Sequence, residues 1–122
     1  MNGPRVLLVE DEGLVAMMVE DMLSDMGCEV AASLGRVRDT LEWLDRGEAF
    51  DGALLDVNLG GGEKVFPVAE ALAARRIPFA FTTGYGDVSG SPFPDAPVLG
   101  KPMQRQNLER VLRGFGLADR PG

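Results

Sequence analysis

The chain of 122 residues contains no histidine and a single cysteine, Cys28. Without histidine there can be no histidine-based acid/base catalysis and no histidine-ligated zinc site. One cysteine cannot close an internal disulfide or build a thiolate metal cluster, so we expect Cys28 to be a small buried hydrophobic residue. Any chemistry must therefore come from carboxylates, hydroxyl groups and lysine.

Long apolar runs and an excess of positive charge are also missing. The amino-terminal stretch MNGPRVLLVEDE has only a short apolar run, too short for a signal peptide or a membrane-spanning helix, and this favours a cytoplasmic location. With 12 basic and 19 acidic residues the net charge is -7, which leaves no basic face for a nucleic acid or an anionic membrane. We therefore expect neither direct nucleic-acid binding nor membrane binding.

The remaining composition is that of a small globular domain. Hydrophobic residues make up 45% of the chain and charged residues 25%, which argues against a disordered or fibrous protein. The length suffices for one hydrophobic core but not for two. Because no internal repeat or linker interrupts the pattern, we predict a single domain over residues 1–122.

Five short apolar runs alternate with stretches of helical periodicity. Several of these runs are continuous rather than alternating, which is typical of strands buried on both faces. The order predicts an α/β fold with a doubly wound, five-stranded parallel sheet of the flavodoxin-like type. The predicted strands are 6–9, 30–34, 53–55, 79–82 and 98–99.

The helical stretches carry apolar stripes, and one expected helix is missing. The first stripe includes Met18, Met22 and Met26, which we interpret as core-filling, and it ends at Gly27, a typical residue after a helix. Further stripes lie at 37–44, 65–72 and 108–115. Between the last two strands, residues 84–97 contain three prolines, which interrupt helical hydrogen bonding. The fourth helix should therefore be short or absent.

Acidic residues follow two of the predicted strands. Glu10 and Asp11 follow the first strand and Asp56 follows the third, while Thr83 and Lys101 follow the last two. The carboxyl ends of parallel strands meet at one sheet edge. Two like charges about 4 Å apart repel by roughly 4 kcal/mol at an effective dielectric near 20, so this cluster calls for a cation.

The cluster has the residue types that phosphoryl transfer needs. Oxygen ligands without histidine or thiolate favour Mg²⁺, with Mn²⁺ as an alternative. Asp56 stands at the exit of a buried run and is followed by the glycines 60–62, which would keep the next loop clear of an incoming phosphodonor. We interpret Asp56 as the nucleophile, with a lysine and a hydroxyl group to contact the transferred oxygens.

Four fragments in order, VLLVEDE, LLDVNL, TTGYGD and GKP, resemble the receiver domain of bacterial two-component response regulators over essentially the whole chain. The resemblance implies that Asp56 accepts a phosphoryl group whose oxygens contact Thr83 and Lys101. It also implies a set of Mg²⁺ ligands: Asp11, Asp56, the backbone carbonyl of Asn58, and Glu10 through water.

The same resemblance implies a biological role. A receiver takes its phosphoryl group from a sensor histidine kinase or a phosphotransferase, catalyses its own Mg²⁺-dependent phosphorylation and dephosphorylation without being a turnover enzyme, and signals by protein binding or phosphate relay. Receivers present their first helix to the kinase, so Leu14 and Met17 are the candidate partner contacts. The stretch PFAFTTGYG at 78–86 is similar to the signature of the FAT GUY group, which is connected with general stress signalling.

The chain also departs from the receiver pattern. Val98 occupies the position where receivers usually carry a switching aromatic residue, and Tyr85 is our hypothesis for its replacement. These departures favour an alternative reading as a pseudo-receiver, a binding module that works without phosphorylation. A Mg²⁺-dependent phosphatase is a further alternative, but it needs a second acid two residues after the nucleophile, where this chain has Asn58, whose amide cannot shuttle protons.

Overall fold

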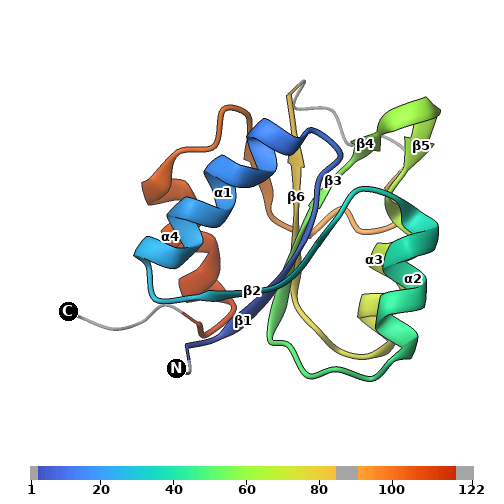
Figure 1. Ribbon diagram of the computed structural model, residues 1–122, viewed down its shortest axis with the longest axis horizontal. Coiled ribbons are helices and arrows are strands. Elements are labelled where there is room, and N and C mark those ends of the chain that lie inside the picture. The colour runs from blue at the N-terminus through green and yellow to red at the C-terminus, as the bar shows by residue number, and fades with distance from the viewer. Residues whose placement is uncertain (1–2, 85–90, 118–122) are drawn as a thin grey trace.

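The computed structural model describes residues 3–84 and 91–117, and a five-stranded parallel sheet lies at its centre (Figure 1). The strand order is β2-β1-β3-β6-β7. The predicted doubly wound sheet is confirmed, and each strand extends its predicted run by one residue at one or both ends. The strands are β1 (Arg5–Val9), β2 (Glu29–Leu34), β3 (Gly52–Asp56), β6 (Phe79–Thr83) and β7 (Val98–Gly100).

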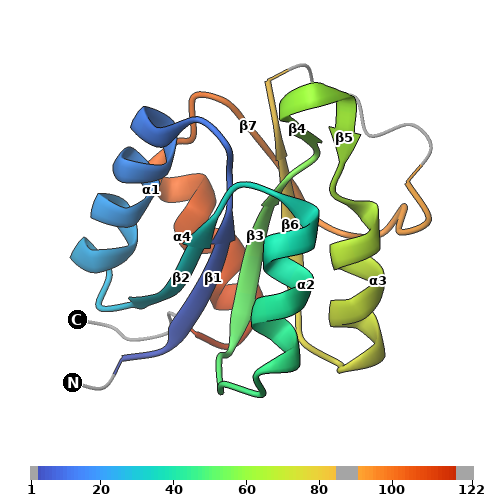
Figure 2. The same ribbon diagram turned by 45° about the vertical axis from the view of Figure 1, so that its right-hand side comes forward.

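Helices cover both faces of the sheet. The helices α1 (Gly13–Asp25) and α4 (Arg105–Gly114) lie on one face, and α2 (Val37–Asp45) and α3 (Phe66–Ala74) lie on the other (Figures 1 and 2). Successive strand residues enter opposite cores, so that Leu54 packs with α1 and α4 while Leu55 packs with α2 and α3. Burial on both faces explains the continuous apolar runs. No helix in the described parts of the chain could span a membrane.

The buried face of α1 differs from the predicted one. Ala16, Val19 and Leu23 are buried, whereas Met18 is 48% exposed. The prediction that Met18 fills the core is therefore wrong, although Met22 is half-buried. Residues 16, 19 and 23 follow the i, i+3, i+7 spacing of one narrow helix face, and Met18 lies at the border of that face.

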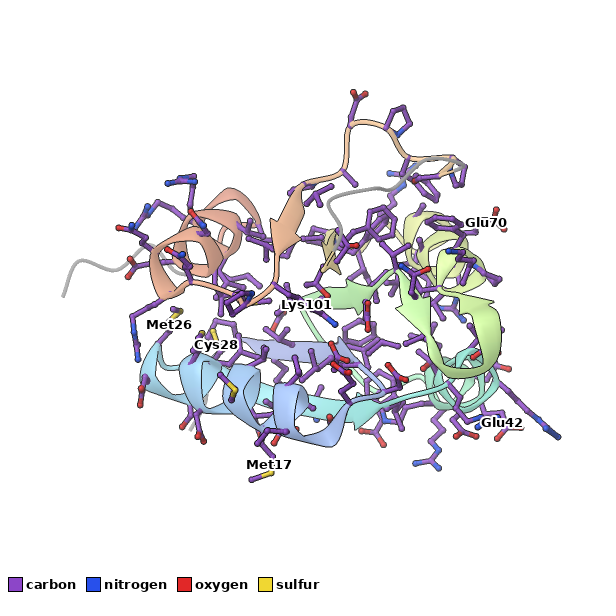
Figure 3. The ribbon with its side chains drawn as sticks, turned by 90° about the horizontal axis from the view of Figure 1, so that it is seen from above. Met17, Met26, Cys28, Glu42, Glu70 and Lys101 are labelled. Carbon is purple, nitrogen blue, oxygen red and sulfur yellow. The ribbon has the colours of Figure 1, made fainter. Side chains whose placement is uncertain are left out.

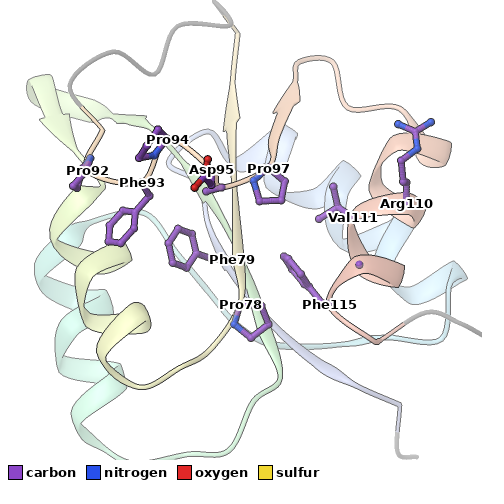
Figure 4. A pocket seen from close by; sticks show the side chains of 12 residues that line it. Pro78, Phe79, Pro92, Phe93, Pro94, Asp95, Pro97, Arg110, Val111 and Phe115 are labelled. Atoms are coloured by element: carbon purple, nitrogen blue, oxygen red, sulfur yellow. The ribbon is translucent and has the colours of Figure 1, made fainter.

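The segment before β7 contains no helix in its described part, residues 91–97. Instead Phe93 packs against Phe79 with ring centroids 5.3 Å apart in an edge-on arrangement. An open apolar hollow of about 710 Å³ separates this segment from α4, where Phe115 lines its other side (Figure 4). The expected absence of a regular helix between β6 and β7 therefore holds for residues 91–97. Tyr85 lies outside the described residues, so its role stays a hypothesis.

A small hairpin that the sequence pattern did not predict follows β3. The two-residue strands β4 (Asn58–Leu59) and β5 (Glu63–Lys64) pair antiparallel around the single turn Gly60–Gly62. Gly61 and Gly62 have φ angles of 75° and 79°, in the left-handed region that glycine adopts without strain. The glycines therefore serve a tight chain reversal directly beside Asp56. The hairpin also contacts α2, because Glu63 Oε1 accepts the N–H of Val37 at 3.1 Å.

The corrected face of α1 can be tested by two alanine variants. Leu23→Ala should lower the free energy of unfolding by about 2–5 kcal/mol, because it leaves a cavity under a fully buried side chain. Met18→Ala should cost less than about 1 kcal/mol, because nearly half of that side chain is already in water. Urea unfolding monitored by circular dichroism measures both values, and equal losses would show that Met18 belongs to the core.

Candidate functional site

The predicted acidic residues meet at the carboxyl edge of the sheet. Glu10 follows β1 and Asp56 ends β3, and both are nearly buried, with 6% and 4% of their surface exposed. Asp11, the next residue after Glu10, is exposed. Each of the three offers a carboxylate oxygen, and these oxygens lie within 4.8 Å of one another. The structure thus brings Asp56 beside Glu10 and Asp11, two adjacent acids that are far from it in the sequence.

Lys101 is the basic residue inside this cluster. Its Nζ lies 2.8 Å from Glu10 Oε1 and 3.0 Å from Asp56 Oδ2. Figure 3, a view onto this edge, shows the side chain pointing inward from the segment after β7. Burial by itself lowers the pKa of Lys101. The hydrogen bonds to Glu10 and Asp56 and the negative charges of both residues raise it by more, so the pKa lies above its ordinary value. Lys101 is therefore held as a cation between two carboxylates.

One ammonium group does not balance the cluster. Burial, together with the charge of Glu10, raises the pKa of Asp56 from 3.8 to about 6, although Lys101 acts in the opposite direction. Three carboxylates facing one lysine leave a surplus of negative charge in a partly buried place. Only oxygen ligands are present, and they lie close enough together to share one ion. The residues therefore fit a hard divalent cation such as Mg²⁺.

Backbone groups orient the carboxylates. Glu10 Oε2 accepts the N–H of Glu12 at 3.0 Å, and Asp56 Oδ1 accepts the N–H of Asn58 at 3.3 Å. Gly60 approaches closely, because a Cβ atom there would lie 3.2 Å from Asp11 Oδ2. The first glycine of the triplet thus leaves room for the Asp11 carboxylate, while the other two make the turn.

An open pocket of about 240 Å³ lies over Asp56. A small anion such as a phosphoryl group could enter this space beside the ammonium group of Lys101. Asn58 lies on its wall, as the predicted ligand set requires. The lining residues include Asp11, Asp56, Asn58, Gly60, Gly84 and Lys101.

The two threonines of β6 take different positions. Thr83 is buried at the same sheet edge, and its carbonyl accepts the N–H of Lys101 at 3.2 Å, but it is not among the residues that line the open pocket. Thr82 pairs in register with Asp56 and lines a smaller cavity of about 80 Å³ together with Glu10 and Lys101. Sequence reasoning gave Thr82 no role. The parallel register of β3 and β6 is the signal that places it beside the acids.

The candidate partner contacts lie on the first half of α1, next to the acidic edge. Leu14 is 72% exposed and Met17 is 61% exposed. Figure 3 shows the Met17 side chain directed away from the molecule. Both candidate side chains are therefore accessible to a partner. Two large apolar side chains in water on adjacent turns are suited to contact with another protein.

Comparison with known proteins places this geometry in a family. No model of a protein family matches the chain, and no curated protein matches it. Among solved structures, SdrG from Sphingomonas melonis Fr1 is 44% identical over 94% of this chain and 98% of that chain, with a TM-score of 0.82. The BeF3-activated conformation of SdrG from Pseudomonas melonis Fr1 has the same identity and coverage, with a TM-score of 0.77.

Two further structures have the same fold. The signal receiver domain of a modulated diguanylate cyclase from Desulfovibrio desulfuricans G20 is 26% identical, and a response regulator receiver protein from Sinorhizobium medicae WSM419 is 23% identical. Each comparison covers 93% of this chain and 94% of the other, with a TM-score of 0.82. With this likeness, the sheet order and the acidic pocket around Asp56 and Lys101, the chain belongs to the response regulator receiver domains.

Proposed function

We propose that this protein is a receiver that accepts a phosphoryl group on Asp56 from a phosphohistidine of a partner histidine kinase or phosphotransferase. The observation that supports this most directly is the convergence of Asp56, two neighbouring acids and Lys101 beneath one open pocket. A carboxylate alone is a weak nucleophile for a phosphoryl group. Here positive charge can be placed on the transferred oxygens, which is what phosphoryl transfer requires.

The transfer step is an in-line substitution at phosphorus. A carboxylate oxygen of Asp56 forms the new P–O bond while the P–N bond to the donor's ring breaks. The electron pair of the broken bond stays on that ring, which leaves as neutral imidazole when its other nitrogen carries a proton. Lys101 and Thr83 contact the phosphoryl oxygens, and Lys101 already lies at hydrogen-bond distance from Asp56. Hydrolysis of the acyl phosphate later restores the carboxylate.

Glu10, Asp11, Asp56 and the backbone carbonyl of Asn58 would hold Mg²⁺, or Mn²⁺ in its place, with Glu10 acting through water. The bound cation would offset the surplus negative charge of the cluster and would polarise the transferred oxygens. The close approach of the three carboxylates supports this ligand set.

The output of the phosphorylated protein is binding to other proteins or relay of the phosphate, within the cytoplasm. General stress signalling is the proposed setting, supported by the stretch PFAFTTGYG at 78–86. The likeness to SdrG, a protein with a BeF3-activated conformation, supports control of this chain by a change to an activated conformation. The competing possibility, a module that binds partners without phosphorylation, is supported by Val98 in place of a switching aromatic residue.

Covalent modification of Asp56 is the first test. Incubation with Mg²⁺ and acetyl phosphate should add one phosphoryl mass, and Asp56→Asn should abolish the gain because the amide cannot act as the nucleophile. Intact-mass spectrometry measures the change. Asp45→Asn is the matched control, because it removes an exposed carboxylate away from the pocket and should be modified like the wild type. If neither acetyl phosphate nor a histidine kinase modifies the wild type, the module that needs no phosphorylation is the better account.

The surplus of negative charge predicts a pH-dependent stability difference in the metal-free protein. The pKa of Asp56 is about 6 in the folded protein and 3.8 in an ordinary environment, so the unfolded chain loses this proton first as the pH rises. Between about pH 4 and about pH 6 the wild type should therefore lose about 1–3 kcal/mol of stability relative to Asp56→Asn. Below this range the Asp56 proton is bound in both states and contributes no difference.

Urea unfolding in the presence of a chelator, repeated across this pH range, measures the difference. Added Mg²⁺ should stabilise the wild type and have little effect on Asp56→Asn, because the variant has lost a ligand. If the free energies of unfolding of the two proteins changed equally with pH, the charge of Asp56 would not destabilise the folded protein.

The exposed start of α1 predicts a difference between donors. Leu14→Ala combined with Met17→Ala should slow phosphoryl transfer from a partner histidine kinase by roughly tenfold or more, because both side chains would lose buried contact area. Phosphorylation by acetyl phosphate should be unchanged. Val98→Ala on β7 is the control, since it also removes exposed apolar surface. An equal loss with both donors would mean that the double variant damages the pocket itself.

A further inference from the structure

The two lysines of this chain both lie near the acidic pocket. Ten of its twelve basic residues are arginines, and the lysines are Lys64 and Lys101. Lys101 enters the pocket from the segment after β7, whereas Lys64 is the last residue of the β4–β5 hairpin and is exposed. Lysine offers a compact ammonium group on a flexible stem.

Lys64 contacts the wall of the pocket through the side chain of Asn58. Its Nζ donates a hydrogen bond to Asn58 Oδ1, and the antiparallel register of the hairpin places Lys64 opposite Asn58. Asn58 lines the open pocket, and its N–H is bonded to Asp56. Within residues 3–84 and 91–117, no carboxylate lies within ion-pair distance of Lys64. The ammonium group of Lys64 is thus held beside the pocket by a neutral partner.

The charge balance of the pocket indicates a role for the ammonium group of Lys64. Glu10, Asp11 and Asp56 carry three negative charges, Lys101 carries one positive charge, and Glu12 on the pocket wall is a further acid, so a bound divalent cation would bring the pocket at most to neutrality. The whole chain has a net charge of -7. A phosphodonor is itself an anion, and a neutral pocket in an acidic protein does not attract it. Extra positive charge beside the pocket would raise the local concentration of the donor.

We propose that Lys64 is a second phosphodonor-binding residue, which exchanges its hydrogen bond with Asn58 for one with an oxygen of the incoming phosphoryl group. The inference rests on the proposed role of Asp56 as phosphoryl acceptor. Asn58 holds the ammonium group in place until the donor arrives. The contact forms when the donor binds and persists through the transfer. It therefore lowers the half-saturating donor concentration without changing the rate of phosphoryl transfer within the complex of protein and donor.

The test compares Lys64→Gln, Lys64→Arg and wild type in the full chain with Mg²⁺ and increasing acetyl phosphate. Lys64→Gln should raise the half-saturating donor concentration by roughly three- to tenfold and leave the maximal rate within about twofold. Lys64→Arg keeps the charge and should restore half-saturation to near the wild-type value. Arg113→Gln is the matched control, because it removes one positive charge from the last turn of α4 at the far end of the sheet. It should leave half-saturation unchanged.

Mg²⁺ binding without donor separates a charge effect from damage to the pocket. Removing a positive charge beside a cation site should strengthen Mg²⁺ binding in Lys64→Gln, whereas a distorted pocket would weaken it. Half-saturation unchanged in Lys64→Gln, or equally raised in Arg113→Gln, would overturn the role of Lys64, and so would weakened Mg²⁺ binding. If neither acetyl phosphate nor a histidine kinase phosphorylates the wild type, the proposed function fails and the role of Lys64 fails with it.

Discussion

The ion pairs of Lys101 with Glu10 and Asp56 are the contacts on which the acidic edge of this protein depends. Three carboxylates close to one another would repel strongly in a partly buried place, and Glu10 and Asp56 must lose most of their water when the sheet forms. Lys101 offsets part of that cost, and the backbone N–H groups of Glu12 and Asn58 offset a further part. The cluster still carries a net negative charge, which is why it suits a divalent cation. With that cation bound, the site also suits a phosphoryl group.

The parallel sheet makes this concentration of charge possible. Residues 10, 56 and 101 are distant along the chain, yet each follows a strand whose carboxyl end lies at the same edge. Apolar cores on both faces of the sheet anchor these strands, because Leu54 packs on one side and Leu55 on the other. The free energy gained by burying such residues holds the acids together against their repulsion. The stability of the fold therefore offsets the electrostatic repulsion at the site.

Apolar periodicity predicted the sheet, the four helices and the convergence of the acids, since these depend on patterns that repeat along the chain. It did not predict features that depend on a one-residue choice or on contacts between distant segments. The helical spacing of the methionines favours Met18 in the core, while the buried face passes through Ala16, Val19 and Leu23. Thr82 could be related to Asp56 only once the register between β3 and β6 was known.

The triple glycine shows how a local signal can be seen and still be incompletely understood. Its composition pointed to an open loop beside Asp56, whereas the chain reverses there into a hairpin, because two successive residues take left-handed φ angles. That reversal has consequences on three sides. Gly60 clears the Asp11 carboxylate, Glu63 binds the first N–H of α2, and Lys64 reaches Asn58. The hairpin therefore connects the acidic pocket both to α2 and to the second lysine.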